Sequence, residues 1–197
     1  MKLFVTGGTG VLGRAVVAEA IAAGHEVRAL VRDPGRKLPA AELVAGSLSD
    51  MDAVKDGLQG WQAVLHLAGK VSRRPEDASA MHEVHVEGTH RLLDAAEDAG
   101  IKRFILASTS GTIAVSNENI GPMDESHRPD FEVVGRWPYY TSKHLQEKEV
   151  MRRHEQGRIE AIVLNPSLLL GPGDDRISST GDVLDILHKR VPALTSG

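Results

Sequence analysis

A glycine-rich stretch near the N-terminus constrains the fold most strongly. The residues Thr6-Gly7-Gly8-Thr9-Gly10-Val11-Leu12-Gly13 follow a short apolar run, Leu3–Val5, and lead into a helical pattern over residues 11–23. A strand, a glycine turn and a helix in this order form the context in which a glycine pattern indicates nucleotide binding. The spacing is G-x-x-G-x-x-G, which differs from the usual G-x-G-x-x-G of dinucleotide-binding turns.

Each glycine of this turn has its own physical reason. Gly7 allows a sharp turn after the strand, Gly10 lets a pyrophosphate approach the backbone, and Gly13 lets the helix pack closely against the sheet. The free N–H groups and the positive dipole end of the first helical turn then face the phosphates. We therefore expect this turn to bind a dinucleotide through Gly7, Thr9, Gly10, Val11, Leu12 and Gly13.

Strand and helix patterns alternate along the rest of the chain. Strands are expected at residues 26–31, 43–45, 63–67, 103–107 and 161–164, and helices from about Met51 (capped by Ser49) and at 80–99, 139–155 and 181–189. Strands separated by helices imply right-handed crossovers and a parallel sheet covered on both faces. The sequence thus predicts an α/β fold, a Rossmann-like doubly wound parallel sheet forming one dinucleotide-binding domain over residues 1–197.

Several candidate binding residues follow strands directly. They are Arg32, Leu67-Ala68-Gly69, Ser108-Thr109 and Asn165-Pro166. Ligands of such sheets bind beyond the carboxyl ends of the strands, so we expect these residues to line one site with the glycine turn. The long segment 110–138 joins a strand end to the next helix, and segments of this length are often binding loops, so we predict that it covers a substrate.

The composition excludes several classes of function. The 197 residues include no cysteine, which rules out disulfides and thiolate chemistry. The net charge is -4 and the basic residues are scattered, so we expect no nucleic-acid partner. No apolar run approaches the length of about 18 residues that spans a membrane. The start of the chain has no signal-peptide pattern, and we expect a cytoplasmic protein. The run His82-Glu83-Val84-His85 lacks a third ligand, so we expect no metal site.

Tyr139 and Lys143 are the strongest candidates for chemistry. At a spacing of four residues they share one face of the expected helix. An ammonium beside a phenol favours the phenolate and lowers the phenol pKa, which suits an acid–base group. Ser108 and Thr109 end a strand, where a hydroxyl can donate to a carbonyl oxygen. The alternative is that all four are ordinary helix-surface and turn-forming residues.

Short sequence segments, which follow one another in the same order over nearly the whole chain, resemble the extended short-chain dehydrogenase/reductase family. The likeness is closest to its dihydroflavonol-reductase and hydroxysteroid-dehydrogenase branch. The closer likeness lies in Ser108-Thr109-Ser110-Gly111-Thr112 and Leu164-Asn165-Pro166-Ser167. The other segments are Thr6–Gly13, His66-Leu67-Ala68-Gly69, Val86-Glu87-Gly88-Thr89 with Leu92–Ala96, Phe104–Thr109, Pro138–Lys143 and Gly171-Pro172-Gly173.

The resemblance implies specific roles. Tyr139 would be the general acid or base, with Lys143 as its helper and as a ligand of the cofactor ribose. Thr109 would be the catalytic hydroxyl, with Ser108 as the neighbouring alternative, and Asn165, Pro166 and Ser167 would contact the cofactor. Hydride would pass between the nicotinamide and a carbonyl or secondary alcohol of a small-molecule substrate.

The chain also departs from the family pattern. His85 stands where relatives commonly have an asparagine, and we interpret it as structural. Ser47 stands where they usually have an aspartate near the adenine. Relatives are longer, so the C-terminal substrate lobe is expected to be largely absent, with only its start from about residue 171. A homodimer through the helices at 80–99 and 139–155 is common among relatives and is expected here.

The end of the second expected strand bears on the choice of nicotinamide cofactor. An NAD site usually has a carboxylate here, whereas this chain has Val31 followed by Arg32. A guanidinium suits the 2′-phosphate of NADP, and Arg36 or Lys37 would add a second cation. NADP is therefore favoured. NAD stays open because Asp33 would take the carboxylate position if the strand ended later.

Three functions are consistent with these features. The first is an NADP-dependent oxidoreductase. The second is a nucleotide-sugar epimerase or dehydratase that uses NAD, which the absence of an acidic residue at Val31 and of an Asp-Glu pair after Thr109 disfavours. The third is a non-catalytic NADP-binding regulator, which the presence of Tyr139 and Lys143 disfavours.

Overall fold

The six strands form one parallel sheet in a computed structural model that describes residues 1–35, 38, 41–118, 121–174, 177 and 179–191. The sheet order is β3-β2-β1-β4-β5-β6. The chain therefore starts in the middle of the sheet and winds outward in both directions from β1, as the doubly wound prediction requires. The strands are β1 (Lys2–Thr6), β2 (Glu26–Val31), β3 (Glu42–Ala45), β4 (Ala63–His66), β5 (Arg103–Ala107) and β6 (Glu160–Leu164).

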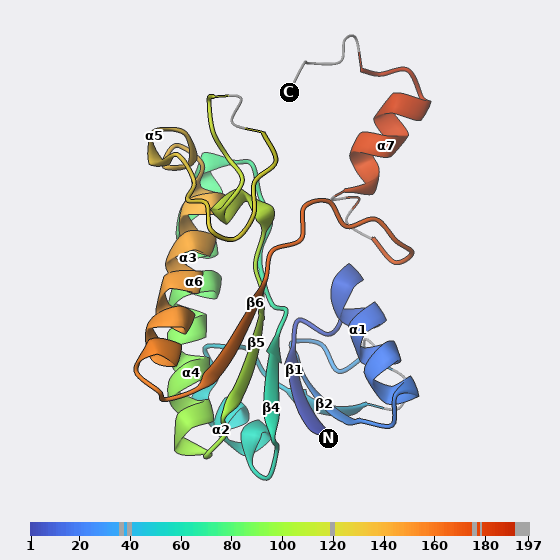
Figure 1. Ribbon diagram of the computed structural model, residues 1–197. Coiled ribbons are helices and arrows are strands. Elements are labelled where there is room, and N and C mark those ends of the chain that lie inside the picture. Colours follow the sequence, from blue (N-terminus) through green and yellow to red (C-terminus); the bar gives the residue numbers. More distant parts are fainter. Residues whose placement is uncertain (36–37, 39–40, 119–120, 175–176, 178, 192–197) are drawn as a thin grey trace.

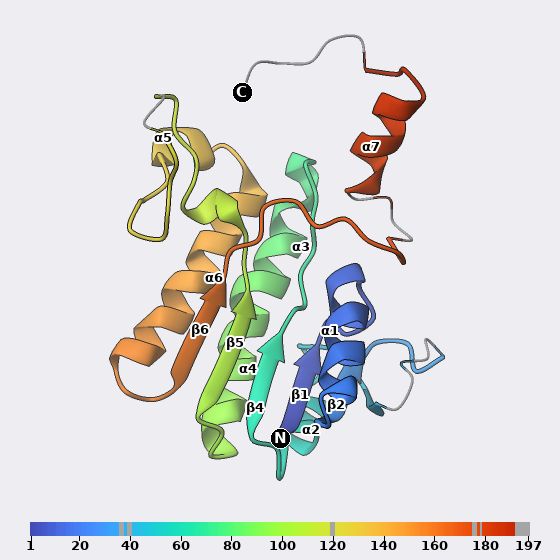
Figure 2. The same ribbon diagram turned by 45° about the vertical axis from the view of Figure 1, so that its right-hand side comes forward.

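Helices cover the two faces unequally (Figures 1 and 2). Helix α1 (Val11–Ala22) lies on one face, and α2 (Met51–Leu58), α4 (Gly88–Asp98) and α6 (Pro138–Glu155) lie on the other. Helix α7 (Thr180–Leu187) stands apart, beyond the end of β6, and has no buried residue. The face of β6 opposite α6 is open, with Ile162 and Leu164 both about half exposed.

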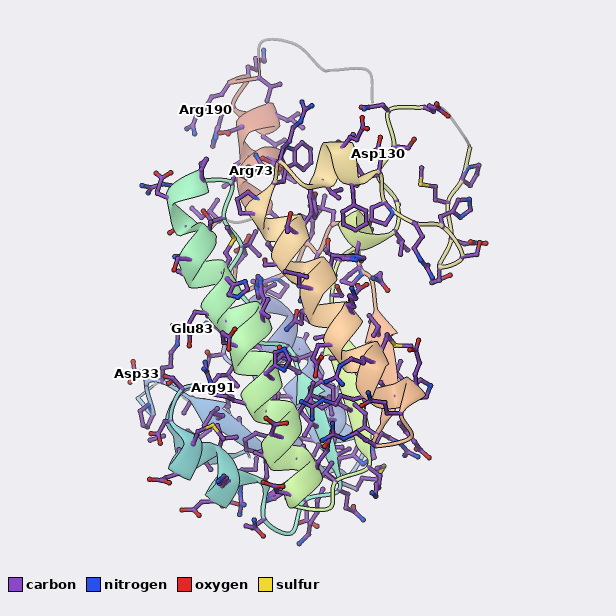
Figure 3. All side chains as sticks on the ribbon, turned by 90° about the vertical axis from the view of Figure 1, so that its left-hand side faces the viewer. Asp33, Arg73, Glu83, Arg91, Asp130 and Arg190 are labelled. Carbon is purple, nitrogen blue, oxygen red and sulfur yellow. The ribbon has the colours of Figure 1, made fainter. Side chains whose placement is uncertain are left out.

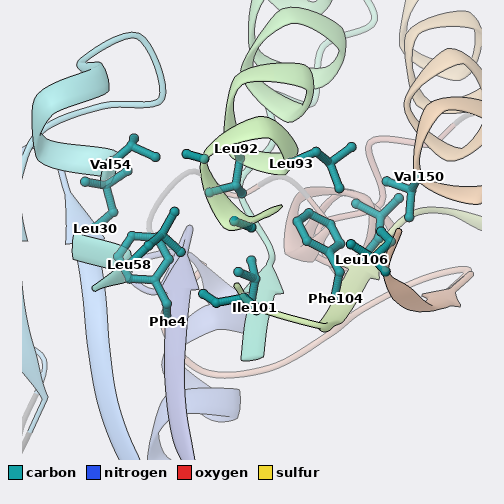
Figure 4. Close-up of a cluster of buried hydrophobic side chains, with 14 residues drawn as sticks. Phe4, Leu30, Val54, Leu58, Leu92, Leu93, Ile101, Phe104, Leu106 and Val150 are labelled. Atoms are coloured by element: carbon teal, nitrogen blue, oxygen red, sulfur yellow. The ribbon is translucent and has the colours of Figure 1, made fainter. Parts of the chain in front are cut away.

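Two apolar clusters hold these layers together. The larger one joins Phe4 and Phe104 of the sheet to α2, α4 and α6, and Figure 4 shows its side chains interdigitating. The smaller one packs Val17 and Ala20 of α1 against Val5 and its neighbours in β1 and β2. Alternate residues of each central strand enter opposite clusters, which is why the strands are continuous apolar runs.

The segment expected as one helix over 80–99 has an irregular start. A 3-10 turn η1 (Pro75–Asp77) precedes it, and the helix itself then runs through α3 (Ala78–His82), a π-helical turn η2 (Glu83–Glu87) and α4. A π-turn inserts one extra residue and turns side chains to a different side of the helix, often at functional sites. Figure 3 shows this composite helix running beside α6, with Glu83 and Arg91 on its outer side.

Two local predictions change in the structure. Asp50, not Ser49, caps α2, because the Asp50 Oδ1 atom accepts from the Ala53 N–H at 3.2 Å. Ser49 instead bonds to the Ser47 hydroxyl at 2.8 Å.

The segment 110–138 contains a 3-10 turn η3 (Ser110–Thr112) and a short helix α5 (Phe131–Val134). Across the described ranges, none of the helices has the length and apolarity needed to span a bilayer.

Candidate active site

The glycine turn between β1 and α1 is closely packed against backbone. Gly7 has a φ of +76°, and a Cβ there would lie 2.5 Å from the Ala68 nitrogen. A Cβ on Gly13 would lie 2.2 Å from the Gly7 oxygen. The N-cap residue of α1 is Gly10, which has no side chain to accept from the first N–H groups of the helix, so these groups are open to another acceptor. This geometry fits a bound phosphate, which needs a close backbone and free N–H donors.

Parallel pairing brings the predicted strand-end residues to one edge of the sheet. The Leu67 N–H donates to the Thr6 oxygen at 3.0 Å, which places Leu67-Ala68-Gly69 beside the glycine turn. The Ser108 N–H donates to the Leu164 oxygen at 2.7 Å, which places Ser108-Thr109 beside the segment that follows β6. The topology therefore gathers segments that are far apart in the chain.

At the end of β2, the last strand residue is Val31 and the exposed Arg32 follows it. The Asp33 carboxylate accepts from the Gly35 N–H at 2.9 Å and so belongs to the turn. The strand does not extend to Asp33, so a cation rather than a carboxylate follows its last residue. Arg36 and Lys37 lie outside the described residues.

Tyr139, in the first turn of α6, meets Thr109 from the end of β5. Burial raises the pKa of the half-buried Tyr139 phenol, and a hydrogen bond with the Thr109 side chain lowers it in part. Ser108 is 7% exposed and its hydroxyl has no hydrogen-bond partner within the described ranges. Tyr140 packs on Trp137 with ring centroids 5.3 Å apart. Thr109 and Tyr139 are thus the pair of hydroxyls that the fold brings together.

Lys143 lies one turn further along α6 and is 3% exposed. Its ammonium donates to the Ala107 oxygen at 2.7 Å and to Gln146 Oε1. Burial lowers the pKa of Lys143 from 10.5 to about 7. The expectation that Lys143 lowers the Tyr139 pKa is wrong for this conformation, because the ammonium is bonded to these two acceptors and burial dominates at the phenol.

The side-chain amide of Asn165 contacts three oxygen atoms of the protein itself in this conformation. Its side-chain NH₂ lies 3.2 Å from the Thr109 oxygen, 2.9 Å from Thr112 Oγ1 and 2.6 Å from Glu147 Oε1. Its amide therefore ties the turn after β5 to helix α6. Pro166 contributes its oxygen, which accepts from the Ser110 N–H at 3.0 Å, and Ser167 is exposed.

His85, in the π-helical turn, lies directly beside the candidate catalytic residues. Its Nε2 atom accepts from the Lys70 N–H at 3.0 Å, and its Nδ1 atom lies 2.8 Å from Ser142 Oγ. Its ring makes an edge contact with Tyr139 at a centroid distance of 5.8 Å. Burial lowers its pKa to about 3, so it is neutral near neutral pH. These contacts support the structural interpretation of His85.

Sequence reasoning missed the buried polar residues around Lys143. Gln146 donates to Thr89 Oγ1 at 2.7 Å, and His66 Nε2 lies 2.9 Å from the same hydroxyl. One signal was available, since Gln146 follows Lys143 by three residues and therefore shares its helix face. Thr89 and His66 had no comparable local signal.

Together, the sheet order, the glycine turn and the strand-end residues define a doubly wound α/β protein of the Rossmann type. The chain belongs to the NAD dependent epimerase/dehydratase family, whose model matches residues 3–191. A ketoreductase of Stigmatella aurantiaca that acts on 4-hydroxy-2-methyl-3-oxo-4-farnesyl-3,4-dihydroquinoline-1-oxide is 34% identical over 88% of this chain and 52% of its own length. Dihydroflavonol 4-reductase of Callistephus chinensis is 27% identical over 85% of this chain and 51% of its own length.

Solved structures agree with this assignment. A short-chain dehydrogenase/reductase superfamily protein of Agrobacterium tumefaciens, solved with NAD, has a TM-score of 0.73 and 37% identity over 84% of this chain and 48% of its own. UDP-glucose 4-epimerase of Thermus thermophilus, solved with NAD, has a TM-score of 0.83 and 25% identity over 97% of this chain and 62% of its own. The resemblance to the extended short-chain dehydrogenases and their dihydroflavonol-reductase-like branch is confirmed. The chain spans about half the length of the curated relatives compared above.

Proposed function

We propose that this chain is the cofactor-binding and catalytic core of an NADP-dependent oxidoreductase acting on a carbonyl or secondary alcohol. The observation that carries the proposal is the meeting of Thr109 and Tyr139 on the edge of the sheet that also bears the glycine turn. The reductase names of two relatives support the reaction class, and the NAD in two related structures supports a nicotinamide cofactor. The domain then covers residues 1–197, with the start of a substrate lobe from about residue 171.

The residues of this chain suit distinct tasks in such a reaction. The nicotinamide, when bound, supplies or accepts the hydride. The first N–H groups of α1 hold the phosphates, and Lys143 holds the ribose hydroxyls. Thr109 donates a hydrogen bond to the substrate oxygen, and Tyr139 moves the proton at that same oxygen.

Substitution of Tyr139 tests the catalytic assignment. Tyr139→Phe removes the proton donor and keeps the ring, so turnover should fall by about 10²–10⁴-fold while NADPH binding persists. Turnover is measured as NADPH oxidation with a panel of ketones and aldehydes, in the longest form of the protein that its gene encodes. Tyr140→Phe is the matched control and should keep its turnover. Near-normal turnover in Tyr139→Phe contradicts the proposal.

Arg32 carries the proposed preference for NADP. Arg32→Ala removes a charge-assisted hydrogen bond to the 2′-phosphate, so NADPH binding should weaken on the order of 10–100-fold while NADH binding is unchanged. Fluorescence titration with both cofactors measures this, with Asp33→Asn as the control at the next residue. Tighter binding of NADH than of NADPH by the unmodified protein refutes the preference and favours an NAD-dependent epimerase or dehydratase, in keeping with the family name.

A further inference from the structure

A chain of hydrogen bonds between buried side chains leads inward from Lys143. The Lys143 ammonium donates to Gln146 Oε1, and Gln146 Nε2 donates to Thr89 Oγ1 at 2.7 Å. His66 Nε2 lies 2.9 Å from that hydroxyl, and His66 Nδ1 lies 2.6 Å from Thr6 Oγ1. All five side chains are between 0% and 3% exposed. They come from α6, α4, β4 and β1, so the hydrogen bonds link the helix that carries Lys143 to Thr6, the residue directly before Gly7.

The direction of each bond follows from the chemistry of the groups. An ammonium only donates, so the Gln146 amide presents its oxygen to Lys143 and its NH₂ to Thr89. Burial lowers the pKa of His66 to about 3, so its ring is neutral. Gln146 Nε2 also lies 3.1 Å from His66 Nε2, which makes that ring atom the acceptor and leaves Nδ1–H to donate to Thr6. Donors and acceptors therefore alternate without conflict from Lys143 to Thr6.

Few charges act on the Lys143 ammonium. Glu147, on the same helix, favours the charged form. His66 from β4 and His85 from the π-helical turn also face it, and burial lowers the pKa of both rings to about 3, so neither carries charge near neutral pH. Tyr139 lies one turn before Lys143 on α6. The direct polar contacts of the amine are both acceptors, the Ala107 oxygen at 2.7 Å and Gln146 Oε1, so both favour the charged form against burial.

We propose that Gln146 is a positioning residue whose side-chain oxygen, oriented by Thr89, holds Lys143 in place and keeps it in the ammonium form. Desolvation favours the neutral amine, and an acceptor in direct contact opposes that preference. Gln146 is suited to hold Lys143 because its amide oxygen accepts from the ammonium while its amide NH₂ donates to Thr89. Its part in the reaction rests on the proposed function, in which Lys143 holds the ribose hydroxyls of the cofactor.

A direct titration of Lys143 tests this role without turnover. The chain is labelled with ¹³C at the lysine ε carbons, and the Lys143 signal is assigned by its loss in Lys143→Met. Gln146→Met has a similar length and no acceptor, so the pKa of Lys143 should fall. Gln146→Glu places a carboxylate at the same point, so that pKa should rise, by about 1–3 units.

Gln156→Glu is the matched control. It makes the same chemical change at an exposed position directly after the last residue of α6. The Lys143 midpoint should stay at its wild-type value, because solvent screens the added charge.

Two results overturn the proposal. One is a Lys143 midpoint that moves by less than the titration error in both Gln146 variants, and the other is a shift in the same direction in both. If Gln146→Met does not fold, as judged by circular dichroism, a midpoint in Gln146→Glu at or below the wild-type value overturns it alone. Because the titration uses no cofactor and no substrate, its failure is distinct from failure of the Tyr139→Phe test.

Discussion

Two buried histidines should make this fold sensitive to mild acid, and replacement of His85 isolates one of them. Burial lowers the pKa of His66 and of His85 from 6.5 to about 3. Both rings are therefore neutral in the folded protein, while the unfolded chain takes up a proton on each as the pH falls below about 6.5. The contribution of the two neutral histidines to the free energy of unfolding is therefore fully present above that pH. It is lost as the pH falls, and the loss levels off near pH 3.

The size of the effect follows from proton linkage. At about pH 5, each histidine lowers the free energy of unfolding by about 2 kcal/mol relative to about pH 7. The pair together lowers it by about 4 kcal/mol, which is a large share of a typical total of about 5–15 kcal/mol. His85→Asn removes one titrating group, so the loss between these two pH values should shrink by about half.

Urea unfolding at the two pH values, followed by tryptophan fluorescence, measures this loss. The difference between the pH values decides the matter, so a uniform destabilisation of His85→Asn does not obscure the result. His82→Asn, on an exposed side chain of the preceding turn, is the control and should lose as much stability as the wild type. An undiminished loss in His85→Asn would refute the assignment of a buried, neutral His85.

Three further predictions follow from local geometry. Gly13→Ala places a methyl group against the Gly7 oxygen, so NADPH binding measured by calorimetry should be lost; retained affinity contradicts the tight turn. Arg153 is 4% exposed and pairs with three carboxylates on α4 and α6. Arg153→Met should therefore lower the free energy of unfolding by about 3–5 kcal/mol, whereas the exposed Arg152→Met should lower it by under about 1 kcal/mol. Equal losses in thermal melts would show that burial of the Arg153 pairs does not matter. Asp50→Ala removes the cap of α2 and should cost about 1 kcal/mol in the same melts, and no change would argue against the cap.

The order of strands and helices was predictable from local patterns. Short apolar runs bounded by glycine and proline gave all six strands within one or two residues. Gly7, with its positive φ, and Gly13, with no room for a side chain, are where the motif required them. The carboxyl-end rule then placed Arg32 and Thr109 at one edge of the sheet, because parallel strands share their direction.

Residues whose partners are distant in the chain could not be predicted in this way. Ser49 and Asp50 are both suitable caps for α2 by residue type, so the sequence did not distinguish them. In the structure Asp50 is the cap, since its carboxylate accepts from the Ala53 N–H. The π-helical turn forms where His85 meets the Lys70 N–H and the Ser142 hydroxyl, contacts that span 15 and 57 residues. The residues next to His85 in the sequence therefore do not predict either of these two contacts.

The sequence by itself determined the strands of the sheet, the glycine turn and the helix that carries Tyr139 and Lys143, because each depends on spacing within one segment. Only the tertiary structure decided the surroundings of Lys143. Gln146 lies 57 residues from Thr89 and 80 from His66. Hydrogen bonds between side chains that distant depend on how helices pack across the sheet, and no local periodicity encodes that packing.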